Sequence, residues 1–213
     1  MKRTLNLSIL ALLFSGSLSA GCGDEENSGP PVPSREERLE TAEKIDASLG
    51  FDAFKIGTPL NKVVNVGKPD SYVYVDDGVR LAAYHKTSTK VKVGGTFFQK
   101  VSLYFGKSSE MQMYRMSRSL TEDIEADRKA QREKDASNDE TVDEAARLAE
   151  LTESHEANCQ SAYGKFEEVW GRGTPRGPGK FIWVGNKVQA TWEYNPVRGI
   201  PTCLIEVRAV HPR

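Results

Sequence analysis

The amino-terminal segment indicates which part of this chain remains in the folded protein, and in which compartment that part folds. Lys2 and Arg3 form a short cationic start. Residues 5–14 are apolar apart from two polar positions, and small residues follow up to Cys22. The apolar run is too short to cross a hydrocarbon core of about 30 Å, which needs about 20 residues, but it has the length of the apolar region of an export signal. We therefore expect residues 1–21 to be a signal peptide that is cleaved off.

The end of this segment, Leu18-Ser19-Ala20-Gly21-Cys22, resembles the lipobox of bacterial lipoproteins, although Ser19 stands where leucine is commonest. The resemblance implies that Cys22 is acylated and anchors the mature chain in a lipid bilayer. Each buried methylene contributes roughly 0.8 kcal/mol, so the several acyl chains of such an anchor hold stably. Gly23 follows, where lipoproteins retained at the inner membrane typically carry Asp, which favours the outer membrane. The alternative is an ordinary secretory signal that leaves Cys22 as a free thiol.

The composition of the remaining chain is that of an ordinary globular protein. Cleavage leaves about 190 residues, enough for one domain of usual size or two small ones. The whole chain has a net charge of −1, and loss of the cationic signal makes the mature chain slightly more acidic. A nucleic-acid-binding protein would show a basic stripe, so we expect no nucleic-acid partner.

Cys159 and Cys203 remain once Cys22 is assigned to lipid. An even number of cysteines in an oxidising compartment predicts a disulfide between them. The alternative is a pair of buried free thiols.

Residues 22–34 are acidic and then rich in proline, and such a segment buries little apolar surface, so we predict a lipidated tether. Ser34 and Glu37 have the spacing of a capping box, and the apolar residues that follow predict a helix as far as Gly50.

Apolar periodicity and turn residues divide the rest of the chain into a first αβ unit at residues 35–134 and a second at residues 141–213. In the first unit they predict a short helix from Pro59, a hairpin at 73–84 that turns at Asp77-Gly78, a strand at 96–105 and a charged helix at 110–134. In the second they predict a helix capped by Thr141 and ending at Trp170, a loop at 171–179, and strands at 181–184, 188–194 and 203–210.

We therefore expect an α+β fold in which helices pack on one face of an antiparallel sheet, and two tandem αβββ units are one arrangement that fits. The segment Ile56-Gly57-Thr58-Pro59, with Val63, Val64, Gly67, Pro69 and the aromatic strands, resembles the helix-then-strands unit of small outer-membrane lipoproteins of the BamE/SmpA type and of the β-lactamase inhibitor protein. The resemblance implies a non-enzymatic domain whose sheet surface binds another protein. The charged region between the units departs from that pattern.

The sequence offers no recognisable catalytic, cofactor or metal motif, so we assign no residue to those roles. The glycine-rich run at 171–177 follows a helix, whereas a phosphate-binding loop follows a strand. His155-Glu156 with Cys159 could be drawn as a metal site, but Cys159 fits a disulfide better. His85 and His211 lie far from these residues in the chain.

Trp183, Trp192 and Tyr194 form a candidate binding face, because aromatic rings dominate binding hot spots, although core packing is the alternative for each tryptophan. We expect a lipid-anchored, non-catalytic envelope protein that binds another envelope protein. One alternative is an envelope hydrolase, which a cluster of His85, Asp76 and a serine would favour. Another is an inhibitor of a secreted enzyme, which a protruding loop at 171–179 would favour.

Overall fold

The computed structural model describes residues 30–52, 54–63, 67–75, 78–86, 91–134, 143–197 and 200–211. The predicted signal peptide, Cys22 and most of the predicted tether lie outside these residues. None of the helices in the described ranges combines the length and the apolar composition needed to span a bilayer.

Three of the four described helices begin at a short polar residue that caps them. Ser34 caps the first: its Oγ accepts a hydrogen bond from Glu37 N at 3.1 Å, and the Glu37 carboxylate accepts one from Ser34 N, which confirms the predicted capping box. Asp143, rather than Thr141, caps the longest helix by accepting from the backbone of the second and third helical residues. The bounds are α1 Arg35–Ser48, α2 Leu60–Val63, α3 Leu120–Lys134 and α4 Glu144–Trp170.

An eight-stranded antiparallel sheet is the centre of the structure, so the predicted α+β class is confirmed. Its strands are β3 Ser71–Val75, β4 Val79–Lys86, β7 Lys100–Phe105, β8 Met111–Ser119, β9 Thr174–Pro175, β10 Lys180–Val184, β11 Val188–Val197 and β12 Ile200–Ala209. Two short pairs lie apart from it: β1 Gly50–Phe51 with β2 Phe54–Lys55, and β5 Val91–Val93 with β6 Thr96–Phe98.

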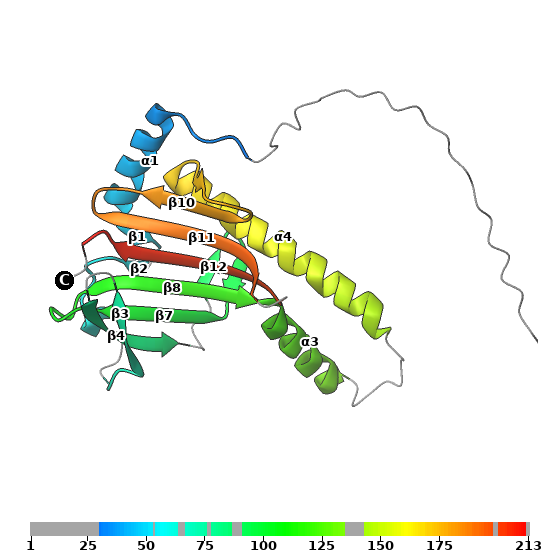
Figure 1. Cartoon of the computed structure of the whole chain (residues 1–213). Coiled ribbons are helices and arrows are strands. Elements are labelled where there is room, and N and C mark those ends of the chain that lie inside the picture. Colours follow the sequence, from blue (N-terminus) through cyan, green and yellow to red (C-terminus); the bar gives the residue numbers. More distant parts are fainter. Residues whose placement is uncertain are drawn as a thin grey trace, which may run out of the picture.

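Both predicted units contribute to this one sheet, whose strand order is β3-β4-β7-β8-β12-β11-β10-β9 (Figure 1). The amino-terminal half supplies the first four strands and the carboxy-terminal half the last four, each as a meander. The halves meet where β8 pairs with β12, from Thr202 opposite Ser119 to Arg208 opposite Met113. Strands from the two halves therefore share hydrogen bonds across the middle of the sheet.

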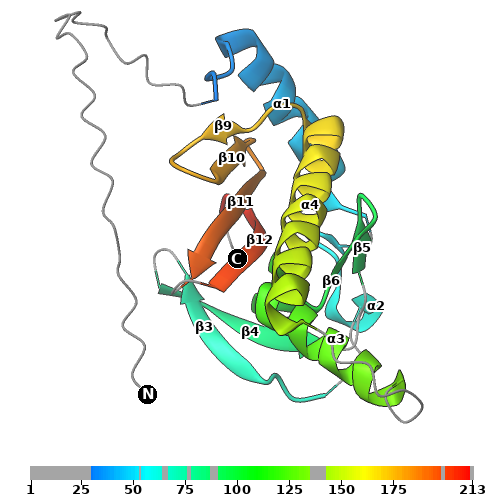
Figure 2. The same ribbon diagram turned by 90° about the vertical axis from the view of Figure 1, so that its right-hand side faces the viewer.

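The main core lies between one face of the sheet and the helices α1 and α4. Figure 2 shows the sheet on one side of α4 and the β5–β6 hairpin on the other. Phe166 and Trp170 of α4 are fully buried. The Phe166 ring contacts Trp192 of β11, and the Trp170 ring contacts Trp183 of β10. A smaller apolar cluster occupies the opposite face near β3 and β4; it is made of Leu81, Ala83, Tyr104 and Met113.

The predicted helix at 110–134 is wrong over its first third, because Met111–Ser119 is strand β8. Met113 and Met116 have the spacing of a helix turn, which misled the prediction. In the structure they are buried on opposite faces, Met116 in the main core and Met113 in the smaller cluster. A central strand that is covered on both faces loses the polar alternation by which a strand is recognised.

Asp46 fastens α1 to the turn between β10 and β11. Its carboxylate accepts hydrogen bonds from the backbone N–H groups of Asn186, Lys187 and Val188 at 2.7, 2.8 and 3.1 Å. Burial alone would raise the pKa of Asp46, but these three donors outweigh it and hold the pKa below its ordinary value of 3.8.

Replacing Asp46 by alanine is expected to lower the free energy of unfolding by about 2 kcal/mol at pH 7, because three backbone donors lose an ionised acceptor. The pKa is lowered in the folded state, so this stabilisation is present above about pH 4 and lost as the pH falls through the folded pKa. Urea unfolding at pH 7 and pH 3 measures both effects. Glu43→Ala, on an exposed position of the same helix, should change stability by less than about 0.5 kcal/mol; an equal loss in both variants would contradict the role of Asp46.

Candidate functional site

The aromatic residues of the predicted binding face lie on the side of the sheet that α4 covers. Trp183 and Trp192 are 1% and 3% exposed, so they belong to the core, the alternative that the sequence left open. Tyr194 is half-buried, and its hydroxyl donates to Glu156 of α4 at 3.2 Å. Burial, together with the Glu156 carboxylate, raises the pKa of Tyr194 above its ordinary value of 10.0, which keeps this hydroxyl protonated.

The opposite face of the sheet carries no helix in the described part of the chain (Figure 1, Figure 2). A hollow of about 360 Å³ lies there over β8, β12, β11 and β10. We call it the open-face hollow. Its lining includes Arg115, Lys180, Ile182, Thr191, Leu204 and Glu206.

Strand register explains how this hollow arises. Arg115, Glu206, Thr191 and Ile182 are aligned in one row across four neighbouring strands. Their neighbours along each strand point into the main core, because side chains alternate between the two faces. Two ion pairs lie in the hollow: Arg115 with Glu206 at 2.5 Å and Lys180 with Glu193 at 3.4 Å. The hollow thus combines half-buried aliphatic side chains with ion pairs already formed.

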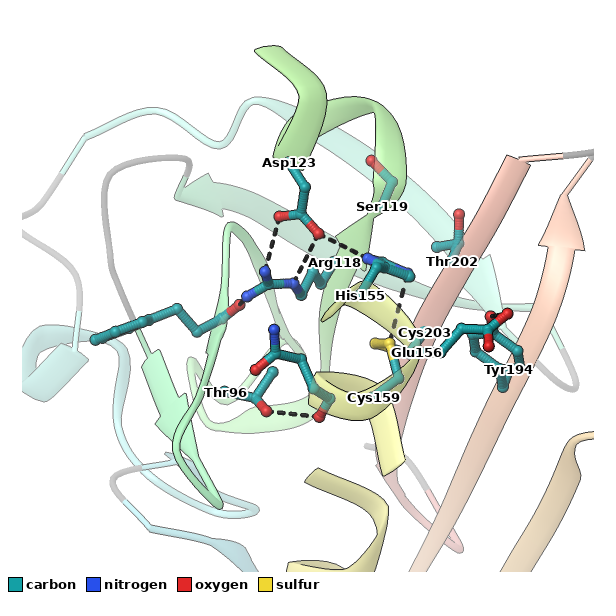
Figure 3. Close-up of a disulfide and its surroundings, with 12 residues drawn as sticks. Thr96, Arg118, Ser119, Asp123, His155, Glu156, Cys159, Tyr194, Thr202 and Cys203 are labelled. Atoms are coloured by element: carbon teal, nitrogen blue, oxygen red, sulfur yellow. Dashed lines mark hydrogen bonds and ion pairs between the residues drawn. A yellow bond between two sulfur atoms is a disulfide. The ribbon is translucent and has the colours of Figure 1, made fainter. Parts of the chain in front are cut away.

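A second cluster surrounds a disulfide between α4 and β12 (Figure 3). Cys159 and Cys203 are bonded, with their Cα atoms 5.9 Å apart, as the cysteine count predicted. His155 lies one turn before Cys159 on the buried face of α4, and its Nε2 atom is 3.5 Å from the Cys159 sulfur. We call Asp123, His155 and the two cysteines the disulfide cluster.

Asp123 holds the histidine of this cluster in place. Its Oδ2 atom is 2.7 Å from His155 Nδ1, and Arg118 forms an ion pair with the same carboxylate at 2.9 Å. Gln99 also donates to the Asp123 carboxylate at 2.7 Å. Burial would raise the pKa of Asp123, but the hydrogen bond to His155 and the charge of Arg118 hold it below its ordinary value of 3.8.

Chain topology brings these groups together. Arg118 is the next-to-last residue of β8, and Asp123 lies in the first turn of α3, where Ser119 and Glu122 form a capping box. Asp123 and Arg118 were not among the sequence candidates, because their partner His155 lies 32 residues beyond Asp123 in the chain. The sequence does contain one indication: His155 and Cys159 lie on one apolar helix face, and a buried histidine there requires a polar partner.

His85 lies between two serines on the sheet. Its Nδ1 atom is 2.8 Å from Ser102 Oγ, and its Nε2 atom is 3.3 Å from Ser71 Oγ. Asp70 accepts a hydrogen bond from the His85 backbone N–H and not from the ring. Asp76, the predicted carboxylate of such a cluster, lies outside the described residues. A catalytic triad requires a carboxylate at the ring nitrogen remote from the serine, which these described contacts do not provide.

The predicted loop at 171–179 is held against the sheet. Its residues Thr174–Pro175 form β9, which pairs with β10. Near its start, the indole N–H of Trp183 donates to the carbonyl of Gly171 at 2.7 Å. Near its end, Gly179 accepts from the backbone N–H of Tyr194. Both ends of the loop are therefore fixed to the edge of the sheet.

Comparison with known proteins returned no match for this chain among protein-family models, curated proteins or solved structures.

Proposed function

We propose that this chain is a lipid-anchored protein of the bacterial outer membrane that binds another envelope protein through the open-face hollow, without catalysis of its own. The observation that carries the proposal is the eight-stranded sheet with helices over one face and a lined hollow on the other. The anchor follows from the lipobox-like segment that ends at Cys22. The resemblance to BamE/SmpA-type lipoproteins implies the same use of a sheet surface.

The make-up of the hollow favours a protein as its occupant. Ile182 and Leu204 supply half-buried aliphatic surface, and the pairs Arg115–Glu206 and Lys180–Glu193 lie beside it in the same two rows. Protein interfaces commonly have an apolar centre and a polar rim, and arginine is enriched in them. Charged side chains that are already paired keep their geometry when a partner displaces water. Binding therefore costs less side-chain entropy than it would with unpaired, mobile side chains.

The tether fits this use of the domain. Residues 22–34 span at most about 45 Å when fully extended, since each residue covers up to about 3.5 Å. The tether would lead from the membrane to α1, which packs on β10 at one end of the sheet. A domain tethered in this way samples partners close to the same membrane surface, where the effective concentration is high.

The substitution Thr191→Arg should abolish partner binding, because it places a long side chain in the middle of the open-face hollow. Thr191 lies opposite Glu206 on β12, so the new guanidinium can pair with that carboxylate and the fold should tolerate it. The measurement is a crosslinking pull-down from native envelopes, and we expect at least a tenfold loss of the proteins captured by the wild type. Thr121→Arg, at an exposed position of α3, is the matched control and should capture them normally.

The same experiment tests the anchor through a Cys22→Ser form exported to the periplasm. This form should lose incorporation of labelled palmitate and capture less of the partner, while its isolated domain remains folded. Undiminished capture by Thr191→Arg would overturn the proposed surface, and palmitate labelling that persists in Cys22→Ser would overturn the proposed anchor.

A further inference from the structure

The disulfide cluster contains three donor atoms that suit a thiophilic metal ion. The ring nitrogen of His155 and the sulfurs of Cys159 and Cys203 all lie within 4.8 Å of one another. All three residues are buried, at 0%, 2% and 0% exposure. Thiolate and imidazole are the ligands from which proteins build Zn²⁺ sites.

The histidine is oriented as metal-binding histidines are. The carboxylate of Asp123, paired with Arg118, only accepts hydrogen bonds, so it fixes the ring proton on His155 Nδ1. The Nε2 lone pair then faces Cys159, whose sulfur in a disulfide has no hydrogen to donate. If the cluster served only as a disulfide, the buried Nε2 atom of His155 would be left without a hydrogen-bond donor at the Cys159 sulfur, which costs free energy. In metal sites the same arrangement is common, because a carboxylate on the remote nitrogen sets the tautomer and the ring angle.

The separations also suit a tetrahedral ion. With Zn–S near 2.3 Å and Zn–N near 2.0 Å, the sulfur and nitrogen of a tetrahedral site lie about 3.5 Å apart. His155 Nε2 and Cys159 Sγ are already 3.5 Å apart. The two sulfurs, once no longer bonded, need a separation of about 3.8 Å, which small side-chain rotations provide from Cα atoms 5.9 Å apart.

A cleft gives reagents a route to the cluster. It has a volume of about 230 Å³, and Cys159 lies in its wall together with Tyr163, Trp192, Tyr194 and Glu156. In Figure 3, Glu156 and Tyr194 lie on the same side of the disulfide. A small dithiol or a metal ion in this cleft therefore lies next to Cys159, which is itself part of the main core.

We infer that Cys159, Cys203 and His155 form a Zn²⁺ site that is closed by the disulfide and opened by a dithiol reductant. The dithiol transfers two electrons and two protons to the disulfide and leaves as a cyclic disulfide, so both cysteines become thiols. Zn²⁺ then binds the two thiolates and His155 Nε2, and the two thiol protons are released to solvent. The fourth position faces the cleft, where water completes the tetrahedron.

The test is metal titration of the full mature protein after reduction with a small dithiol, which is removed before metal is added. Co²⁺ should produce thiolate-to-cobalt charge-transfer bands as two protons are released, and one equivalent of Zn²⁺ should abolish the bands by replacing the cobalt. Zn²⁺ affinity is measured by competition with a chromophoric chelator. The oxidised protein should show none of these signals.

Variants separate a built site from two free thiols. His155→Ala should weaken Zn²⁺ binding at least a hundredfold, and Asp123→Asn, which positions the histidine, should weaken it tenfold to a hundredfold. His85→Ala, which removes a histidine on strand β4 outside the disulfide cluster, should leave the Zn²⁺ affinity unchanged. Circular dichroism before and after Zn²⁺ monitors folding in each case.

Two results would overturn the inference. The first is a reduced wild type that does not compete with the chelator, whether it stays folded or unfolds and fails to refold with Zn²⁺. The second is an affinity that His155→Ala leaves intact. Neither result bears on partner capture by the open-face hollow, which is measured with the oxidised protein.

Discussion

Replacing Cys159 and Cys203 together by alanine is expected to lower the free energy of unfolding by about 4 kcal/mol, one of the two largest effects that the structure predicts. The bridge closes a loop of 44 residues. Cross-linking a loop of that length removes denatured-state entropy worth about 4 kcal/mol at 25 °C. In a domain of this size, the loss corresponds to a fall in Tm of roughly 8–16 °C.

The position of the bridge makes this loss global. It joins α4, the principal helix of the core, to β12, which pairs with β8 where the two halves of the sheet meet. Urea unfolding followed by tryptophan fluorescence measures the effect, since Trp170, Trp183 and Trp192 are all buried in the core. Cys22→Ser is the control, because it removes a cysteine outside the bridge. A double variant within about 1 kcal/mol of the wild type would mean that the bridge contributes little in solution.

Asp123→Asn is expected to lower the free energy of unfolding by about 3 kcal/mol at pH 7, since it leaves buried cationic and polar groups without their anion. The side chain of Arg118 is 14% exposed and that of His155 is 0% exposed, so water replaces little of the lost interaction. Asp127→Asn is the matched control: it lies on the same helix and pairs with the more exposed Arg147. Removal of that pair should change stability by less than about 1 kcal/mol.

The pH dependence of the Asp123 variant provides a separate check. The pKa of Asp123 is lowered in the folded protein, so its contribution is complete above about pH 4 and disappears as the pH falls through the folded pKa. The stability difference between wild type and Asp123→Asn should therefore shrink progressively below pH 4. A difference that stays constant between pH 7 and pH 3 would show that the variant acts by altered packing rather than by loss of charge.

Local features of the fold could be predicted from the sequence alone. The Ser34–Glu37 capping box depends on residues three apart, and the β3–β4 hairpin depends on its turn, so neighbouring side chains suffice to specify them. The bond between Cys159 and Cys203 followed from counting cysteines in an exported chain, without knowledge of the fold.

Features that depend on pairing across the sheet could not be predicted in the same way. Strand β8 was taken for helix because it has buried side chains on both faces, Met116 in the main core and Met113 in the smaller cluster, and the local sequence does not identify the strands that pack with them. The tryptophans of β10 and β11 could belong to the core or to a surface until register placed them under α4. The open-face hollow likewise exists only because four strands align Arg115, Glu206, Thr191 and Ile182 in one row.

By itself, then, the sequence determined the expectation of export and acylation at Cys22, the α+β class, the capping box of α1 and the disulfide partners, because each follows from short spacing or from composition. Only the tertiary structure decided that both halves share one sheet, which face stays open, and that Asp123 meets His155 beside the bridge. These contacts join residues 32 or more positions apart. These contacts depend on how the whole chain packs, so a local sequence pattern cannot predict them.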